Sequence, residues 1–253
     1  MSRIFEEGEY IDLRNVKENL WNFYKHTNER DILTDQIIRI INPKRYYSMI
    51  DIGCGEGNLV MKIHNKIDYC VALDPDKDRL NVLRGQLGRN SNVALINKKF
   101  EDYSADRKFD ITVSCHTLSF FKGKFEMIGK MISITRTPGR IILVLHSEIS
   151  GQMKLLECVN RMIFNRNITH LYAETLCKYI KTKGYNVKLI RVKTRAEFKS
   201  IDEILKLSFF LFRIDFRQLS TEKKHEITNT ITKKLAHKKL LINSVHGVLV
   251  INL

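Results

Sequence analysis

The chain has 253 residues, which suits one domain with a complete hydrophobic core or one domain with a substantial insertion. Hydrophobic residues make up 43% of the sequence and charged residues 28%, a composition typical of soluble globular proteins. No apolar run approaches the ~18 residues of a membrane span, and the N-terminus lacks a signal-peptide pattern, so we expect a cytoplasmic protein that does not enter a membrane.

The spacing of the cysteines and the distribution of charge bear on which ligands and partners the protein can have. The five cysteines are scattered without a C-x-x-C pair, which argues against a metal site and against a disulfide framework. The formal net charge is +15, and residues 178–240 hold 17 Lys and Arg against 6 Asp and Glu. A basic face attracts phosphates, but these charges alternate with apolar residues, which favours solvated faces. We therefore expect only weak, non-specific contact with nucleic acid.

Two amphipathic helices are predicted at the N-terminal end, over residues 15–26 and 29–41. Leu33, Ile37, Ile38 and Ile41 make up the predicted apolar stripe of the second helix. Asn42 and Pro43 follow it directly, and we expect the helix to end there because the residue before a proline disfavours helical backbone.

A short apolar strand over Met49–Ile52 then runs into a glycine loop, with Gly53, Gly55 and Gly57, and a helical pattern begins behind the loop. Glycine is needed where the chain turns with positive φ or where a ligand approaches bare backbone. A strand, a glycine turn and a helix start together suit a nucleotide-like ligand.

The next strand, over residues 69–74, supports the same interpretation. It ends in Asp74, which lies 21 positions after Gly53, and this spacing suits an acid that binds two ribose hydroxyls. Pro75 and Asp76 start a helix whose buried stripe is predicted to contain three leucines, Leu80, Leu83 and Leu87.

The string DIGCGEGN followed by VALDPD resembles the class I S-adenosylmethionine (SAM)-dependent methyltransferases. The resemblance covers residues 46–146 well and the remainder loosely. A NAD site prefers G-x-G-x-x-G and is the competing interpretation, as is a glycine turn that binds no ligand. In this family the cofactor residues implied here are Asp51, Gly53, Cys54, Gly55, Asp74 and Pro75.

The loop after the third strand, residues 92–96, reads KKFEDYS. The family commonly places an acid there that contacts the adenine amino group, but Lys99 stands where Asp is frequent. The resemblance therefore implies Phe100 as a ring or backbone contact and either Glu101 or Asp102 as the hydrogen-bond acceptor.

Residues 109–115, FDITVSC, form the predicted fourth strand, and Cys115 and His116 stand at its end. The carboxyl end of this strand faces the transferred methyl group in this fold. Together with HTLSFF, the string looks like the small-molecule branch, since the Asn/Asp-Pro-Pro-Tyr tetrapeptide of base-amino methyltransferases is absent. The resemblance implies that Cys115 lines the cofactor and that His116 is the catalytic or positioning group next to the acceptor.

The remaining elements alternate between helix and strand. We predict helices over 122–136, 151–164 and 172–183, a turn at Pro138–Gly139, and strands over 140–146, 185–194 and 243–253. Gly184 is expected to cap the third of these helices. The resemblance implies a mostly parallel seven-stranded sheet of order 3-2-1-4-5-7-6 in a Rossmann-like, three-layer α/β fold.

Residues 197–236 are longer than a hairpin between the last two strands requires. We predict one apolar helix over IDEILKLSFFLFRIDF and a second that starts at Ser220. In the family such an insertion shapes the acceptor pocket, so Phe209, Phe210 and Phe212, with Tyr24 from the N-terminal segment, are candidate acceptor contacts.

The sequence thus predicts one methyltransferase domain over residues 1–253, with a helical cap (1–45), a SAM-binding core (46–146) and the helical insertion (197–236). The predicted activity is transfer of a methyl group from SAM to nitrogen or oxygen of a small-molecule acceptor. Two alternatives remain open: an RNA methyltransferase that uses the basic 178–240 face, and a protein that binds SAM without catalysis. The oligomeric state is not determined by the sequence.

Overall fold

The computed structural model describes residues 20–253 apart from 89–90, 166–169, 213 and 236–239. These residues form two compact units. We call residues 33–145, 172–192 and 247–253 the sheet unit. The described residues of 1–32, 146–171 and 193–246 are the helical unit.

The sheet unit alternates strands and helices along the chain. Its elements, some of which extend into the helical unit, are α2 (Glu29–Ile41), β1 (Ser48–Ile52), α3 (Asn58–Ile63), η1 (His64–Lys66), β2 (Tyr69–Leu73), α4 (Lys77–Gln86), β3 (Val93–Ile96), η2 (Phe100–Asp102), β4 (Phe109–Cys115), η3 (Leu118–Phe120), α5 (Lys124–Ser133), β5 (Thr135–His146), α7 (Ala173–Thr182), β6 (Asn186–Glu197) and β7 (Leu241–Asn252).

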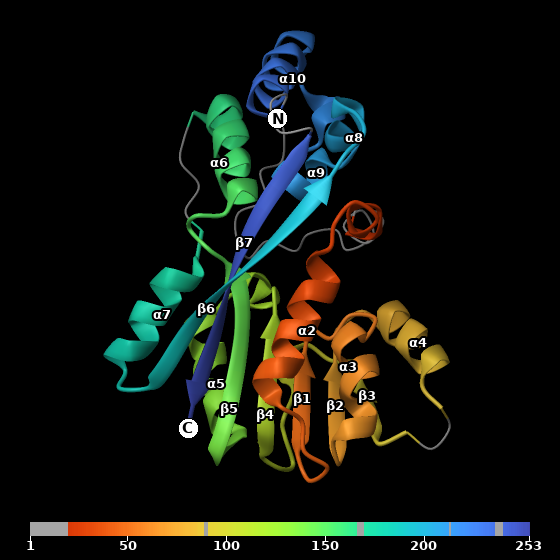
Figure 1. Cartoon of the computed structure of the whole chain (residues 1–253), viewed down its shortest axis with the longest axis vertical. Coiled ribbons are helices and arrows are strands. Elements are labelled where there is room, and N and C mark those ends of the chain that lie inside the picture. Colours follow the sequence, from red (N-terminus) through yellow and green to blue (C-terminus); the bar gives the residue numbers. More distant parts are fainter. Residues whose placement is uncertain (1–19, 89–90, 166–169, 213, 236–239) are drawn as a thin grey trace. The chain divides into compact units, whose positions relative to one another are not determined.

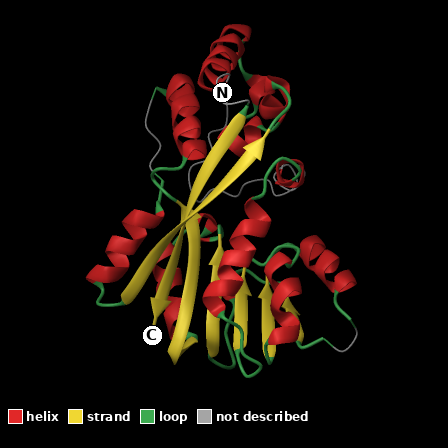
Figure 2. Cartoon of the chain, in the orientation of Figure 1, coloured by secondary structure: helices red, strands yellow, loops and turns green. Residues whose placement is uncertain are grey.

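The seven strands form one sheet of order β3-β2-β1-β4-β5-β7-β6, as predicted (Figure 1). The pairs β1·β2, β2·β3, β1·β4 and β4·β5 are parallel, while β7 runs antiparallel to its neighbours (Figure 2). The carboxyl ends of β1, β2, β3 and β4 therefore meet at one edge of the sheet. In open α/β sheets, ligands bind beyond this edge.

Burial on both faces explains the apolar strands. All five residues of β1 are buried, because helices cover both faces of a parallel sheet. Figure 1 shows α2 and α3 in front of the sheet and α5 behind it. Leu33, Ile37 and Ile41 of α2 are buried, as predicted, whereas Ile38 is only half-buried.

The helical unit contains α6 (Gly151–Phe164), α8 (Ile201–Lys206), α9 (Ser208–Phe212), η4 (Phe216–Gln218) and α10 (Thr221–Leu235). Two side chains tie its helices to α6: Asn160 donates a hydrogen bond to the Phe212 carbonyl (3.2 Å), and Lys223 donates one to the Met162 carbonyl (3.0 Å). In the part of the chain that the structure describes, no helix has both the length and the apolar character of a membrane span.

The prediction of a single apolar helix at the start of the insertion is wrong. The segment forms α8, α9 and the short turn η4 instead. Asp215 accounts for the last break, because its carboxylate accepts a hydrogen bond from the Arg217 backbone N–H (3.1 Å) and so competes with a helical pattern. The second predicted helix is confirmed as α10, and the Ser220 hydroxyl accepts the Lys223 N–H at its start (3.2 Å).

Three other predictions are corrected or bounded. Pro138 and Gly139 do not form a turn but lie inside β5, where the register against β4 shifts between Phe109 and Ile111. A proline lacks the N–H of a regular ladder and is tolerated at such an irregularity. Leu87, predicted to belong to the buried stripe of α4, lies just after this helix and is only half-buried. Of the predicted helix over 15–26, residues 20–24 are helical, and residues 15–19 lie outside the described part.

Gly247 tests the packing of β7 within the sheet unit. A Cβ atom at Gly247 would overlap the Ala173 side chain, so Gly247→Ala should destabilise the protein by about 1–3 kcal/mol through overpacking. Gly129 in α5 is the matched control, because a Cβ atom there meets no atom within 4 Å. Gly129→Ala should stabilise the protein by up to about 1 kcal/mol through helix propensity. Chemical denaturation measures both, and equal effects of the two substitutions would contradict this packing.

Candidate cofactor and acceptor site

The glycine loop between β1 and α3 is held in a conformation that side chains disfavour. Gly53, Gly55 and Gly57 have φ values of +75°, +58° and +81°. The backbone N–H groups of Gly53 and Cys54 both donate to the Leu73 carbonyl (2.8 and 3.1 Å), which ties the loop to the end of β2. The sequence correctly predicts a glycine turn with positive φ at the carboxyl edge of the sheet, and its contact with a ligand stays a prediction.

Asp74 lies directly after β2 and closes against this loop. One carboxylate oxygen accepts the Gly55 N–H and the other accepts the Asp76 N–H, both at 2.8 Å. Burial raises the pKa of Asp74, and these two hydrogen bonds oppose the rise. Each oxygen keeps a second lone pair, so the carboxylate can still accept from a pair of vicinal hydroxyls.

Asp51 is a second buried acid beside the same loop. It is only 4% exposed and lies on β1, between Ala72 of β2 and Val113 of β4. Burial and the negative charge of Asp74 raise the pKa of Asp51 to about 7. A ligand that brings a positive charge to this place would favour the ionised form of Asp51.

The two cysteines of the predicted site are not arranged as nucleophiles. Burial and the charges of Asp51 and Asp74 raise the pKa of the Cys54 thiol well above its ordinary value, so this thiol is neutral at physiological pH. Cys115 is half-buried at the end of β4. Both residues can line a ligand through backbone and sulfur contacts.

The turn after β3 carries the predicted adenine contacts. Phe100 is buried, whereas Glu101 and Asp102 are exposed and follow it in η2. Asn97 donates hydrogen bonds to the carbonyls of Asp74 (3.1 Å) and Pro75 (2.9 Å). This side chain ties the loops after β2 and β3 to each other, so the acidic turn and Asp74 stand at adjoining strand ends.

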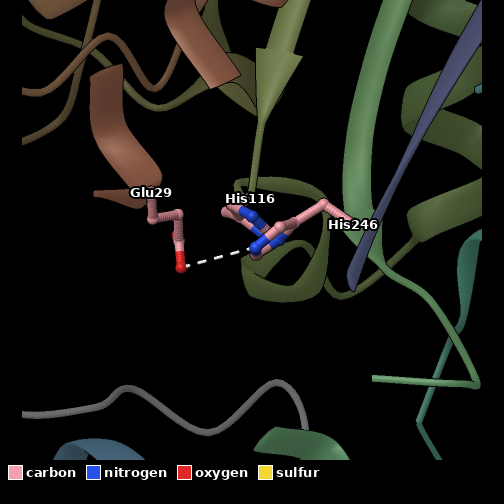
Figure 3. Close-up of side chains that lie close together, drawn as sticks. All are labelled: Glu29, His116 and His246. Atoms are coloured by element: carbon pink, nitrogen blue, oxygen red, sulfur yellow. Dashed lines mark ion pairs between the residues drawn. The ribbon is translucent and has the colours of Figure 1, made fainter. Parts of the chain in front are cut away.

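His116 lies at the carboxyl end of β4 with a φ of +54° (Figure 3). Its backbone N–H donates to the Val144 carbonyl of β5 (3.0 Å). Burial lowers the pKa of His116 to about 4, so its imidazole is neutral at physiological pH. The next residue, Thr117, packs against Gly53, where a Cβ atom would overlap its hydroxyl. The glycine loop and the end of β4 are therefore in direct contact.

The predicted acceptor contacts outside the sheet unit belong to the helical unit. The Arg30 guanidinium lies 5.1 Å from the ring centroid of Tyr24, and the Phe210 ring lies 4.8 Å from that of Phe23. Phe212 is 1% exposed and packs in the core of this unit. The side chain of Phe209 lies outside the described part. The prediction that Tyr24, Phe209 and Phe210 share an acceptor pocket with His116 therefore stays a prediction.

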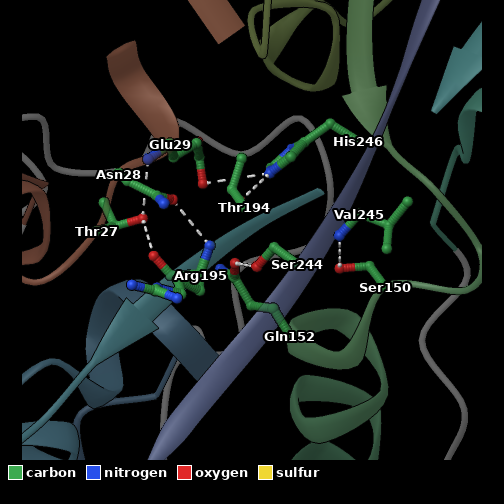
Figure 4. Close-up of polar contacts among 10 residues, drawn as sticks. All are labelled: Thr27, Asn28, Glu29, Ser150, Gln152, Thr194, Arg195, Ser244, Val245 and His246. Carbon is green, nitrogen blue, oxygen red and sulfur yellow. Dashed lines mark hydrogen bonds and ion pairs between the residues drawn. The ribbon is translucent and has the colours of Figure 1, made fainter. Parts of the chain in front are cut away.

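A polar network in the helical unit was not expected from the sequence (Figure 4). His246 is fully buried; its Nε2 lies 2.8 Å from the Thr194 hydroxyl and 3.6 Å from a Glu29 carboxylate oxygen (Figure 3). Burial raises the pKa of Glu29 to about 7. Thr27 and Asn28 bond to the Arg195 backbone, so the network fastens the segment before α2 to β6.

Four residues of the sheet unit contact the loops at the carboxyl edge and were not predicted from the sequence: Arg79, Asn97, Thr117 and Lys130. Thr117 had a weak signal, because it follows the fourth strand within two positions. Arg79, whose guanidinium comes within 3.1 Å of a Cβ at Gly55, had none.

These residues fit a nucleoside that carries an amino-acid tail. Asp74 offers acceptor positions for ribose hydroxyls, Phe100 offers an apolar contact beside an acidic turn, and Asp51 offers a negative charge for a cationic group. The three glycines allow the positive φ values of the loop, and Thr117, Arg79 and Leu83 pack in the space beside them.

Comparisons with known proteins agree with this arrangement. Residues 49–139 match the family model of the methyltransferase domain. The chain is 23% identical over 240 residues to malonyl-[acyl-carrier protein] O-methyltransferase 1 of Ilyobacter polytropus, covering 79% of this chain and 88% of the relative. It is 27% identical over 143 residues to the second such enzyme of that organism, covering 53% of this chain and 54% of the relative.

The fold is also shared with solved structures. A SAM-dependent methyltransferase from Thiobacillus denitrificans, in complex with S-adenosylhomocysteine, superposes with a TM-score of 0.61 at 13% identity, over 96% of this chain and 99% of that one. The strand order, the glycine loop with Asp74 and the family match together lead to one conclusion. The chain carries a methyltransferase domain over residues 49–139, in the class I fold that it shares with these structures.

Proposed function

We propose that this enzyme transfers a methyl group from SAM to oxygen or nitrogen of a small-molecule acceptor. The observation that carries the proposal is the position of His116, a neutral imidazole at the carboxyl end of β4. The two curated relatives are named for O-methylation of malonyl-[acyl-carrier protein], which supports an oxygen acceptor.

We assign the cofactor contacts within the sheet unit. Asp74 accepts from the ribose hydroxyls, Phe100 and Glu101 or Asp102 contact the adenine, and Asp51 lies toward the cationic amino-acid tail. Gly53, Cys54, Gly55, Pro75 and Cys115 complete the site through backbone and van der Waals contacts. This assignment follows the order of strand ends along the sheet edge.

For this reaction, the main task of the protein is to position the acceptor and the methyl donor. The sulfonium of SAM supplies an activated methyl group, which the acceptor attacks in line while a neutral thioether leaves. The chain's own residues hold acceptor and methyl carbon in line and exclude water. A His116 with a pKa of about 4 is a weak base, so it suits hydrogen bonding to an acceptor that is already nucleophilic. A carboxylate oxygen or an unprotonated amine meets that condition.

The distribution of charge supports a small acceptor over RNA. Several basic side chains at or near the 178–240 face are paired with acids: Arg191 with Glu174, Arg195 with Glu197, Arg217 with Asp215, and Lys223 with Glu226. Such pairing lowers the field that a phosphate backbone would meet. A screen of carboxylic acids, amines and phenols by release of S-adenosylhomocysteine tests the proposal. Methylation of RNA, with no turnover of any small molecule in the screen, would refute the proposal.

Asp74 should decide cofactor affinity. Asp74→Asn removes the charge that its two backbone donors and the ribose hydroxyls share, so S-adenosylhomocysteine should bind more weakly by about 1–3 kcal/mol in calorimetry. Asp68→Asn makes the same chemical change at an exposed site of the sheet unit and should leave affinity unchanged. Wild-type affinity in Asp74→Asn would remove Asp74 from the site.

Asp51 should reduce the stability of the ligand-free protein at high pH. Its pKa is about 7 in the folded protein and near 3.8 otherwise, so the folded state binds more protons between these values. Stability should therefore fall as pH rises through this window, by up to about 1.4 kcal/mol per unit of pKa difference. Asp51→Asn removes this dependence.

Thermal melts without cofactor measure the effect. Asp51→Asn should melt above the wild type at pH 8 and approach it at pH 4, while binding S-adenosylhomocysteine more weakly. A difference in melting temperature that does not vary with pH would contradict the burial of a charge at Asp51.

His116 should affect turnover more than cofactor binding. His116→Gln keeps a polar side chain but loses the imidazole geometry, so kcat should fall by about tenfold or more while the affinity for S-adenosylhomocysteine stays near that of the wild type. Because the pKa of His116 is about 4, the wild-type rate should show no inflection from this group between pH 6 and pH 9. His225→Gln, on the exposed face of α10, is the control. An unchanged kcat in His116→Gln would make this histidine structural.

A further inference from the structure

Lys130 makes an unusual set of contacts with the turn after β3. Its ammonium donates hydrogen bonds to the carbonyls of Phe100 (2.6 Å) and Glu101 (2.8 Å). The same nitrogen lies 5.0 Å from the centroid of the Phe100 ring. An ammonium has three donors, and two of them are used on consecutive carbonyls of one turn.

Both partners of this contact are firmly placed. Met127, Ile128 and Met131 of α5 are buried, which fixes the helix that carries Lys130. Phe100 is 2% exposed, and its ring lies 5.9 Å from that of Phe121. The lysine therefore links a packed helix to a packed ring, and the backbone between Phe100 and Asp102 cannot rotate freely.

The contacts of Lys130 determine the orientation of the turn after β3 as well as its position. When the Phe100 and Glu101 carbonyls point to Lys130, the side chains and N–H groups of the turn are held in one orientation at the end of β3. Asn97 ties the start of the same loop to the carbonyls of Asp74 and Pro75. The turn is thus fixed at both ends relative to Asp74.

We propose that Lys130 is a positioning residue for the methyl donor, and that it holds the Phe100–Asp102 turn in the orientation that recognises the adenine base. This role rests on the adenine contacts assigned above. Lys130 does not touch the ligand; it acts through the two carbonyls and the Phe100 ring. Because the contacts of Lys130 determine where the hydrogen-bond acceptor for the adenine amino group lies, their loss lowers both the affinity for the ligand and the selectivity for the base.

The test compares two ligands that differ only in the base. S-adenosylhomocysteine carries an amino group at position 6 of the purine, and S-inosylhomocysteine carries an oxygen there, which reverses the hydrogen-bonding pattern. Calorimetry with both ligands gives an affinity and a discrimination ratio for each variant. The wild type is expected to prefer the adenine ligand.

Lys130→Met keeps the length of the side chain and removes all donors. It should lower the affinity for S-adenosylhomocysteine by about tenfold and bring the discrimination ratio toward one, because the turn loses the two hydrogen bonds that orient its adenine contacts. Lys130→Arg retains two donors and should recover most of the ratio. Lys181→Met changes an exposed lysine of α7 in the same unit and should alter neither quantity.

Each possible binding result tests a different assumption. An unchanged ratio in Lys130→Met overturns the proposal, even if affinity and melting temperature fall together, because the residue then contributes stability alone. A wild type that binds both ligands equally refutes the adenine contacts of the turn, and a wild type that binds neither refutes the cofactor site itself. Should Lys130→Met fail to fold, Lys130→Gln replaces it, and the same ratio decides.

Discussion

The hydrogen bond from the Gly55 N–H to the Asp74 carboxylate is the interaction on which the rest of the site depends. It joins the ends of β1 and β2, and the two bonds from the Gly53 and Cys54 N–H groups to Leu73 reinforce it. The three glycines with positive φ allow the backbone to come this close. These hydrogen bonds hold the glycine loop and the Asp74 carboxylate together at one end of the sheet.

This closure has an electrostatic consequence. Asp51 and Asp74 are both 4% exposed, and the negative charge of Asp74 contributes to the raised pKa of Asp51. Two buried carboxylates are costly unless they are hydrogen-bonded or meet a positive charge. Backbone N–H groups satisfy Asp74, whereas Asp51 retains a pKa of about 7. A positive charge brought close to Asp51 would offset the cost of ionising this buried carboxyl.

The remaining strand ends are held by side chains that reach across to backbone carbonyls. Asn97 joins the loops after β2 and β3, Lys130 fixes the turn after β3, and Thr117 packs on Gly53 from the end of β4. Each contact joins two loops through polar groups that are otherwise hard to satisfy near a packed core. These contacts join the loops at this edge of the sheet to one another. His116, whose pKa is about 4, lies at the same edge as a neutral imidazole.

Local patterns in the sequence determined much of this protein. The apolar periods predicted most helices and strands, because each depends on neighbouring residues and on the regular geometry of helix and strand. The glycine string and the spacing to Asp74 carried the family resemblance, and that resemblance implied the strand order. Only the tertiary structure decided the roles of Asn97 and Lys130, the break at Asp215 and the course of β5 through Pro138. Lys130 meets carbonyls about thirty positions earlier in the chain, and β5 accommodates its proline against β4. Such long-range contacts leave no periodic trace in a sequence, since they arise only when packed elements bring distant residues together.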